Sequence, residues 1–440
     1  MKYHHLILLL AALAGLSSEA GATDNVFKIS GSTVVVPSGT HTVEGNPVVV
    51  KVPKSFTVDP AEIAATSEWL KLSPKKPEGF FSGTRLSGPT TGAINALASL
   101  IEDSLVIAKS GRTLVKGRDY LVSSPFALVG IGPEPSVTTN DTVEASYSYR
   151  LQRVDSIYCA ADGTPGFVRG TPAVAAPAIP SVPAGSVRLA NIYRPLGATE
   201  ILPEHIYPVS ESADQTHTAT LRGRIPKTLA KIRSGVPVKI VTWGDSITVG
   251  ADVEQEDAWA YAIREALAKK FPSAKFSYSN ISIGGTRTVQ WLADGDYPGL
   301  RRESKDRCTF KRVLAEKPDL VVMEFLNDAS LKVEQVPPAY ETIRDEFRAA
   351  GIEWIIITPG FLIPHSYDLS VMRKPDDRPY IRFVRQFAAD NGIALADAAA
   401  RWEHLWREGI PWFILLNNGF NHPGAAGHRM FVEEVVRCFE

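Results

Sequence analysis

The order of apolar runs between residues 223 and 440 most constrains the fold of this 440-residue chain. Short runs with almost no polar interruption, VKIVTW, DLVVMEF and EWIIIT, alternate with longer stretches that carry apolar residues at helical spacing. Strands that are apolar on both faces belong in a parallel sheet with helices on each side. The pattern therefore predicts an α/β domain over residues 223–440.

Residues 23–222 have a different periodicity. STVVVPSG and NPVVVKVP are short β-branched runs, while TLVKGRDYLV and DTVEASYSYRL alternate apolar and polar residues. Both patterns are typical of half-buried strands, so we expect a β-rich accessory domain. One short helix is expected at TTGAINALASLIED. The Pro- and Ala-rich segment 160–188 predicts an extended loop, or a seam between two small β units.

The first 22 residues have the pattern of an export signal. Lys2 is followed by an apolar run from Leu6 to Leu16 and by the small residues Ala20-Gly21-Ala22. This is the order of a cleavable signal peptide, and the run is too short to cross a bilayer comfortably. We expect cleavage near Ala22, a secreted or periplasmic protein, and no stable membrane insertion; a membrane anchor is the alternative.

Charge and cysteine content narrow the classes of function. The 47 basic and 48 acidic residues leave a formal charge of −1, which gives no electrostatic reason to expect nucleic acid as a partner. Cys159, Cys308 and Cys438 are too few for a disulfide framework and lack metal-ligand spacing. We expect no metal and no cofactor. A Cys308–Cys438 bridge and three unpaired thiols both fit the sequence.

Polar segments follow the predicted strands VKIVTW, FSYSNIS and DLVVMEF, and a fourth precedes the last predicted helix, GAAGHRMFVEEVVRCF. Because ligands bind beyond the carboxyl ends of parallel strands, these segments are expected to share one functional edge of the sheet. They are Gly244-Asp245-Ser246, Gly284-Gly285, Asn327-Asp328, and His422.

The residue types in these segments suit acyl transfer. Ser246 at a strand-to-helix corner can expose a nucleophilic hydroxyl, and its own N–H lies where negative charge is favoured. The Gly285 N–H and the Asn327 side-chain amide can serve as further oxyanion donors. His422 can accept the serine proton and return it to a leaving group. Their order at one edge favours a serine hydrolase.

With these segments, residues 225–440 resemble the SGNH hydrolases, also called the GDSL esterase/lipase family. The resemblance implies a three-layer α/β/α sandwich of flavodoxin-like type around a mostly parallel five-stranded sheet. It also implies carboxylic ester hydrolysis, with Ser246 as nucleophile and His422 as general base. The implied oxyanion donors are the Ser246 N–H, Gly285 and Asn327, and the supporting residues are Asp245, Asp328 and Asn418.

Two positions depart from the family pattern. Phe325 stands where the third block usually has Gly, and Gly419 stands where the family has the Asp three residues before its His. The residue that orients the His422 ring is therefore open. The ring could be oriented by Asn418, by Asn417, by a backbone carbonyl, or by an acid from elsewhere such as Asp397. Alternatively, the site is a Ser-His dyad with no third residue.

The resemblance and the export signal together predict removal of acetyl or short acyl groups from a poly- or oligosaccharide. A lipase or lysophospholipase is one alternative, and a non-catalytic surface-binding protein with a decayed hydrolase fold is another. Trp243, Trp259 and Trp291 either stack on sugar rings or belong to the core. His428 is expected to be structural. The accessory domain is either a carbohydrate-binding or positioning module, or a spacer.

Overall fold

The computed structural model describes residues 27–212, 220–298, 300, 304–360 and 378–440. Its C-terminal part contains a five-stranded sheet in the order β20-β19-β21-β22-β23, in which every pair is parallel. This order, 2-1-3-4-5 along the chain, defines the flavodoxin-like fold. The predicted fold class is confirmed. The strands are β19 (Val238–Gly244), β20 (Phe276–Ser282), β21 (Leu320–Glu324), β22 (Glu353–Ile357) and β23 (Ala394–Ala396).

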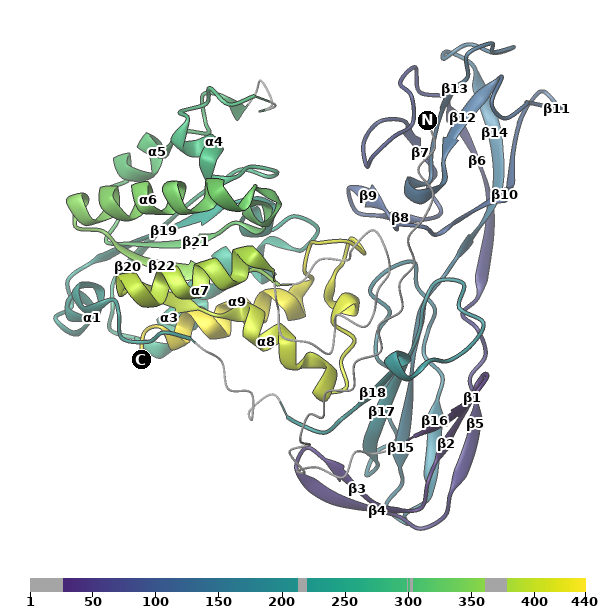
Figure 1. Ribbon diagram of the computed structural model, residues 1–440, viewed down its shortest axis with the longest axis horizontal. Coiled ribbons are helices and arrows are strands. Elements are labelled where there is room, and N and C mark those ends of the chain that lie inside the picture. The colour runs from purple at the N-terminus through teal and green to yellow at the C-terminus, as the bar shows by residue number, and fades with distance from the viewer. Residues whose placement is uncertain (1–26, 213–219, 299, 301–303, 361–377) are drawn as a thin grey trace, which may run out of the picture.

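Helices cover both faces of this sheet (Figure 1). Alternate residues of β19 point into two separate cores: Trp243 packs into the first, and Ile240 into the second. The first core is covered by α4 (Thr288–Leu292), α5 (Phe310–Ala315), α6 (Val336–Ala350) and α7 (Pro379–Asn391). The second is covered by α1 (Pro226–Arg233), α3 (Trp259–Lys270) and α9 (Ala425–Arg437).

The two cores settle two questions that the sequence left open. Trp243, Trp259 and Trp291 are fully buried, so they are core residues and not sugar platforms. Cys308 lies in the first core and Cys438 in the second, on opposite faces of the sheet. Of the two alternatives that the sequence left open, the Cys308–Cys438 bridge is therefore excluded, and all three cysteines are free, buried thiols.

The β-rich part consists of antiparallel sheets around two cores. One core lies under β6 (Ile63–Lys71), β10 (Leu100–Lys109) and β14 (Thr142–Arg150). The other joins strands β1 to β5, between residues 28 and 57, with β15 (Arg153–Cys159), β16 (Pro165–Val168), β17 (Val187–Arg194) and β18 (Ile206–Pro208). The stretch from β6 to β14 is thus inserted between two halves of the second group. Segment 160–188 contains β16 and connects neighbouring strands of one sheet, so it is not a seam between units.

The helix expected within residues 90–103 is absent, and this prediction is wrong. The stretch forms a two-stranded hairpin of β8 (Thr90–Thr91) and β9 (Ile94–Asn95), followed by the start of β10. Gly92 is the first residue of the two-residue loop and has φ +59°. A positive φ at this position of a tight hairpin suits glycine and reverses the chain.

The β-rich part packs against the C-terminal part through buried aromatic rings. Tyr193 and Tyr207 share a core with Trp412 and Phe413, and the ring centroids of Tyr193 and Phe413 are 4.0 Å apart. The Asn191 side-chain amide also donates to a backbone carbonyl of the C-terminal part at 2.6 Å. A buried, aromatic contact of this kind favours one fixed docking of the two parts.

The expected signal peptide and its cleavage near Ala22 lie outside the described residues. Secretion therefore stays a prediction. In the described ranges, none of the helices combines the length and apolar character that a membrane crossing requires.

His428 in α9 is structural in its contacts. Its ring is buried, and Nδ1 accepts the backbone N–H of Trp259, the first residue of α3, at 3.2 Å. Burial, with a smaller effect from the charge of His422, lowers the pKa of His428 from 6.5 to about 3. The neutral ring thus satisfies a helix-terminal donor that would otherwise be unpaired.

We predict that His428→Asn makes the stability less sensitive to acid. Between about pH 3 and pH 6.5 the folded state binds fewer protons than the unfolded state at this residue, so stability falls as pH falls. The contribution is on the order of 2 kcal/mol between pH 7 and pH 5. Asn keeps an acceptor but does not titrate. Urea unfolding at both pH values measures the difference, and an equal acid loss in the wild type and the variant would contradict it.

Candidate active site

Ser246 follows the end of β19, at the carboxyl end of the sheet and next to β21. It begins α2 (Ser246–Val249), and Asp245 caps this helix by accepting the Ile247 N–H at 3.1 Å. Gly244 passes so close to β21 that an added Cβ would come within 2.1 Å of the Glu324 carbonyl oxygen. The Gly-Asp-Ser segment therefore combines a close backbone approach, a helix cap and a hydroxyl at the carboxyl end of the sheet.

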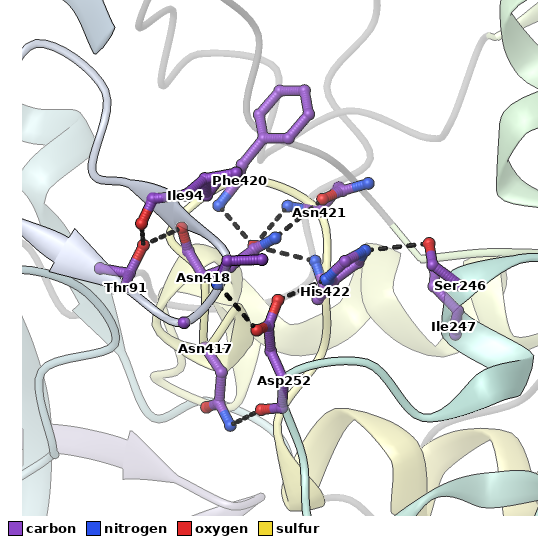
Figure 2. A network of polar contacts seen from close by, with 12 residues as sticks. Thr91, Ile94, Ser246, Ile247, Asp252, Asn417, Asn418, Phe420, Asn421 and His422 are labelled. Carbon is purple, nitrogen blue, oxygen red and sulfur yellow. Dashed lines mark hydrogen bonds and ion pairs between the residues drawn. The ribbon is translucent and has the colours of Figure 1, made fainter. Parts of the chain in front are cut away.

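His422 lies against Ser246 and joins it to Asp252 (Figure 2). The Ser246 hydroxyl lies 2.9 Å from His422 Nε2, and Asp252 Oδ2 lies 2.5 Å from His422 Nδ1. An ionised carboxylate only accepts hydrogen bonds, so Nδ1 carries the proton and Nε2 is left to accept the hydroxyl. The arrangement can therefore move a proton from Ser246 to His422.

Asp252 is the residue that the sequence reasoning missed. Its side chain is 11% exposed, and its backbone has φ +62°, a conformation that Asp tolerates better than most residues. The Asn417 side-chain amide holds this backbone by donating to the Asp252 carbonyl oxygen at 2.9 Å. Burial raises the pKa of Asp252, but the hydrogen bond and charge of His422, with smaller effects from the Ala93 N–H and the charge of Arg85, together hold this pKa below its ordinary value.

The orienting residues considered from sequence have other roles. Asp397 caps α8 (Ala398–His404) and pairs with Arg385 at 2.8 Å, so it is not the partner of His422. The Asn418 side chain hydrogen-bonds to its own loop, and the hydrogen-bond partners of the His422 ring among the described residues are Asp252 and Ser246. The presence of Asp252 also excludes the simple dyad. Asp252 stands in the acidic stretch ADVEQED, where residue type and spacing alone do not distinguish it from its neighbours.

Asn418 fixes the loop that carries His422. Its Oδ1 accepts the backbone N–H groups of Phe420, Asn421 and His422 at 2.9, 2.9 and 3.0 Å. Asn418 is 1% exposed, so its amide oxygen is protected from competing water. One buried amide oxygen therefore sets the course of the loop.

The expected oxyanion residues lie around Ser246. A Cβ added to Gly284 would lie 3.6 Å from Ser246 Cβ, while the space at Gly285, which has φ +76°, is open. The Asn327 backbone N–H donates to Asp245 Oδ2 at 2.9 Å, which ties the loop after β21 to the residue before Ser246. In the part of the chain that the structure describes, the Gly285 N–H donates to no protein acceptor. The role of these groups as oxyanion donors stays a prediction.

Three buried carboxyl groups, Asp245, Glu324 and Asp328, support the loops around Ser246. Asp328 accepts the Thr288 N–H and hydroxyl at 2.9 and 2.8 Å, so it braces the start of α4. Burial raises the pKa of Asp328 to about 7 and that of Glu324 well above its ordinary value. A raised pKa favours the neutral carboxyl group, so less negative charge is buried next to the loop that carries Ser246. Among the described residues, no three His, Cys, Asp or Glu side chains are grouped so that they could hold a metal ion.

Comparison with known proteins identifies the family of the C-terminal part. Residues 242–430 match the GDSL-like lipase/acylhydrolase family. The chain therefore carries a domain of this family after its β-rich part, and the resemblance inferred from sequence is confirmed. A search of curated proteins finds no match.

Solved structures similar to this chain include several esterases. A two-domain esterase active on acetylated mannans is 20% identical with a TM-score of 0.39, and the match covers 50% of this chain and 53% of that protein. The present chain thus spans about half the length of that esterase. TesA is 20% identical with a TM-score of 0.34, and the match covers 46% of this chain and 98% of TesA. An acetyl xylan esterase from Geobacillus stearothermophilus is 21% identical with a TM-score of 0.33, over 46% of this chain and 94% of that chain.

We predict that Asn418→Ala destabilises the protein and Asn418→Asp does so much less. Alanine leaves three half-buried N–H groups without their acceptor, which costs about 2–4 kcal/mol. Aspartate keeps the acceptor oxygen, and three N–H donors offset the burial of its charge. Chemical unfolding monitored by tryptophan fluorescence measures both variants. Equal stability of the alanine variant and the wild type would contradict this role.

Proposed function

We propose that the protein is a secreted serine esterase that removes acetyl or other short acyl groups from a carbohydrate. The observation that carries the proposal is the hydrogen-bonded series Ser246–His422–Asp252 at the carboxyl edge of the sheet. It supplies a nucleophile, a base and an acid that orients the base. A binding module needs none of these groups in this geometry.

Acylation begins at the Ser246 hydroxyl. As Oγ attacks the ester carbonyl carbon, its proton passes to His422 Nε2, and the imidazolium that forms is stabilised by the Asp252 carboxylate. The carbonyl oxygen becomes an oxyanion, which accepts hydrogen bonds from the Ser246 and Gly285 N–H groups and the Asn327 side chain. His422 then gives the proton to the leaving sugar oxygen, and the acyl group remains on Ser246.

Deacylation uses the same proton-transfer steps, with water as the nucleophile in place of Ser246. His422 Nε2 accepts a proton from a water molecule as its oxygen attacks the acyl carbon, and the oxyanion forms at the same donors. Collapse of this intermediate breaks the bond to Ser246 Oγ, which takes the proton back from His422. The products are a short carboxylic acid and the free enzyme.

The carbohydrate part of the proposal rests on the surroundings of His422. Phe80 of the β-rich part lies with its ring centroid 4.8 Å from that of Phe420, two residues before His422. The neighbouring residue Phe81 is 65% exposed. An exposed ring beside the loop that carries His422 can cover the apolar face of a sugar, which makes the accessory part a natural place for the carbohydrate.

We expect Ser246→Ala and His422→Ala to lower kcat/KM on p-nitrophenyl acetate by at least about 10⁴-fold. Asp252→Asn should lower it by about 10²- to 10⁴-fold, since asparagine cannot stabilise the imidazolium by charge. Asp257→Asn, an exposed acid in the same loop, is the matched control and should keep wild-type activity. Activity that survives Ser246→Ala would overturn the assignment of the nucleophile.

We expect kcat/KM for p-nitrophenyl acetate to exceed that for the octanoate by about tenfold or more, and acetate to be released from acetylated oligosaccharides. A preference for octanoate, or hydrolysis of lysophospholipid, would instead indicate the lipase class. A purified protein that is inert on all of these esters and does not react with a serine-directed phosphonate would indicate the non-catalytic alternative.

A further inference from the structure

The tip of the β8–β9 hairpin, which belongs to the β-rich part, reaches the carboxylate of Asp252. The Ala93 backbone N–H donates to Asp252 Oδ1 at 3.3 Å, while Oδ2 of the same carboxylate faces His422. The two oxygens of Asp252 are thus divided between the two parts of the chain. The acid is held on one side by the base and on the other by the accessory hairpin.

Gly92 sets how close this approach is. A Cβ added there would come within 2.0 Å of Asp252 Oδ1 and 2.8 Å of its Cγ, so only glycine leaves room for the carboxylate. Arg85 steadies the tip by donating to the Gly92 carbonyl oxygen at 2.9 Å, and its positive charge also favours the ionised form of Asp252. The absence of a side chain at Gly92 and the hydrogen bond from Arg85 thus both keep the hairpin tip in contact with the Asp252 carboxylate.

The same hairpin also holds the loop that carries His422. The Thr91 hydroxyl, in a buried side chain, donates to the Asn418 carbonyl oxygen at 2.8 Å (Figure 2). Asn418 in turn fixes the backbone of His422 through its side-chain oxygen. The hairpin therefore contacts both the acid and the loop of the base, on two different elements of the C-terminal part.

We propose that the β8–β9 hairpin of the accessory part is a positioning element of the active site, in which Gly92 and Ala93 fix the Asp252 carboxylate and Thr91 fixes the His422 loop. This inference rests on the proposed function. It assigns the accessory part a role in the catalytic step itself, in addition to any binding of substrate. The backbone of Asp252 has a positive φ, a strained conformation that neighbouring structure must maintain. Asn417 holds the carbonyl oxygen of this backbone, and the hairpin holds the carboxylate of the same residue.

The test uses the full chain and a pair of matched glycine variants. Gly92→Ala adds a methyl group against Asp252. Gly31→Ala is the control, because Gly31 has nearly the same φ, +57°, also begins a two-residue hairpin loop, and has nothing within 4 Å of an added Cβ. Both variants place alanine at a similar positive φ, and only the first disturbs the carboxylate.

We expect Gly92→Ala to lower kcat on p-nitrophenyl acetate by about 10- to 100-fold with little change in KM, since an ångström-scale displacement of a catalytic group has an effect of this size. Gly31→Ala should keep the wild-type kcat. In an Asp252→Asn background Gly92→Ala should have less than about a twofold further effect, because both changes act through one carboxylate. A wild-type kcat in Gly92→Ala, an equal loss in Gly31→Ala, or full additivity with Asp252→Asn would each overturn the proposal.

Two further measurements keep the test decisive. Thr91→Val, which removes only the hydroxyl, should lower kcat several-fold; it replaces Gly92→Ala if that variant does not fold, and an unchanged kcat would then overturn the proposal. The low-field proton resonance of His422 Nδ1–H, assigned by its loss in Asp252→Asn, should shift in Gly92→Ala and stay in place in Gly31→Ala. If the wild type hydrolyses no ester, the proposed function fails, while an unshifted resonance in Gly92→Ala would overturn the positioning role.

Discussion

The contact between Asp252 and His422 is the interaction on which the rest of the site depends. It fixes which ring nitrogen carries the proton, and thereby leaves Nε2 free to face Ser246. The two residues come from loops 170 positions apart, so the contact exists only when the sheet places the end of β19 beside the loop before α9. The flavodoxin-like strand order provides that placement, because it puts the β19 corner at the carboxyl edge.

The β-rich part and the C-terminal part contact each other directly at two separate places. Aromatic packing around Tyr193 and Phe413 holds the accessory sheet against the C-terminal part, and the β8–β9 hairpin meets Asp252 at a second place. Because two contacts at separate places fix orientation as well as distance, the hairpin can hold its position to the accuracy that catalysis needs. The docking of the β-rich part against the C-terminal part therefore also sets the position of the Asp252 carboxylate, which the proposed ester hydrolysis requires.

Much of the C-terminal fold followed from the sequence, because continuous apolar runs separated by helical patterns have few solutions other than a covered parallel sheet. The positions of Ser246 and His422 also followed, since strand ends and the loop before the last helix converge at one edge. The error in the hairpin region had a local cause. The apolar residues of TTGAINALASLIED resemble a helical pattern, and the effect of Gly92 on chain direction outweighed it.

The sequence by itself determined the residue types, their order along the chain, and hence the class of chemistry that they can perform. Only the tertiary structure decided which acid serves His422. By residue type, Asp252, Asp397 and Asn418 could each orient the His422 ring. Which of them reaches the ring depends on long-range packing, which no local sequence pattern encodes. The tertiary structure alone also brought an accessory hairpin to the same carboxylate, since a contact between residues 159 positions apart depends on how two independent cores dock.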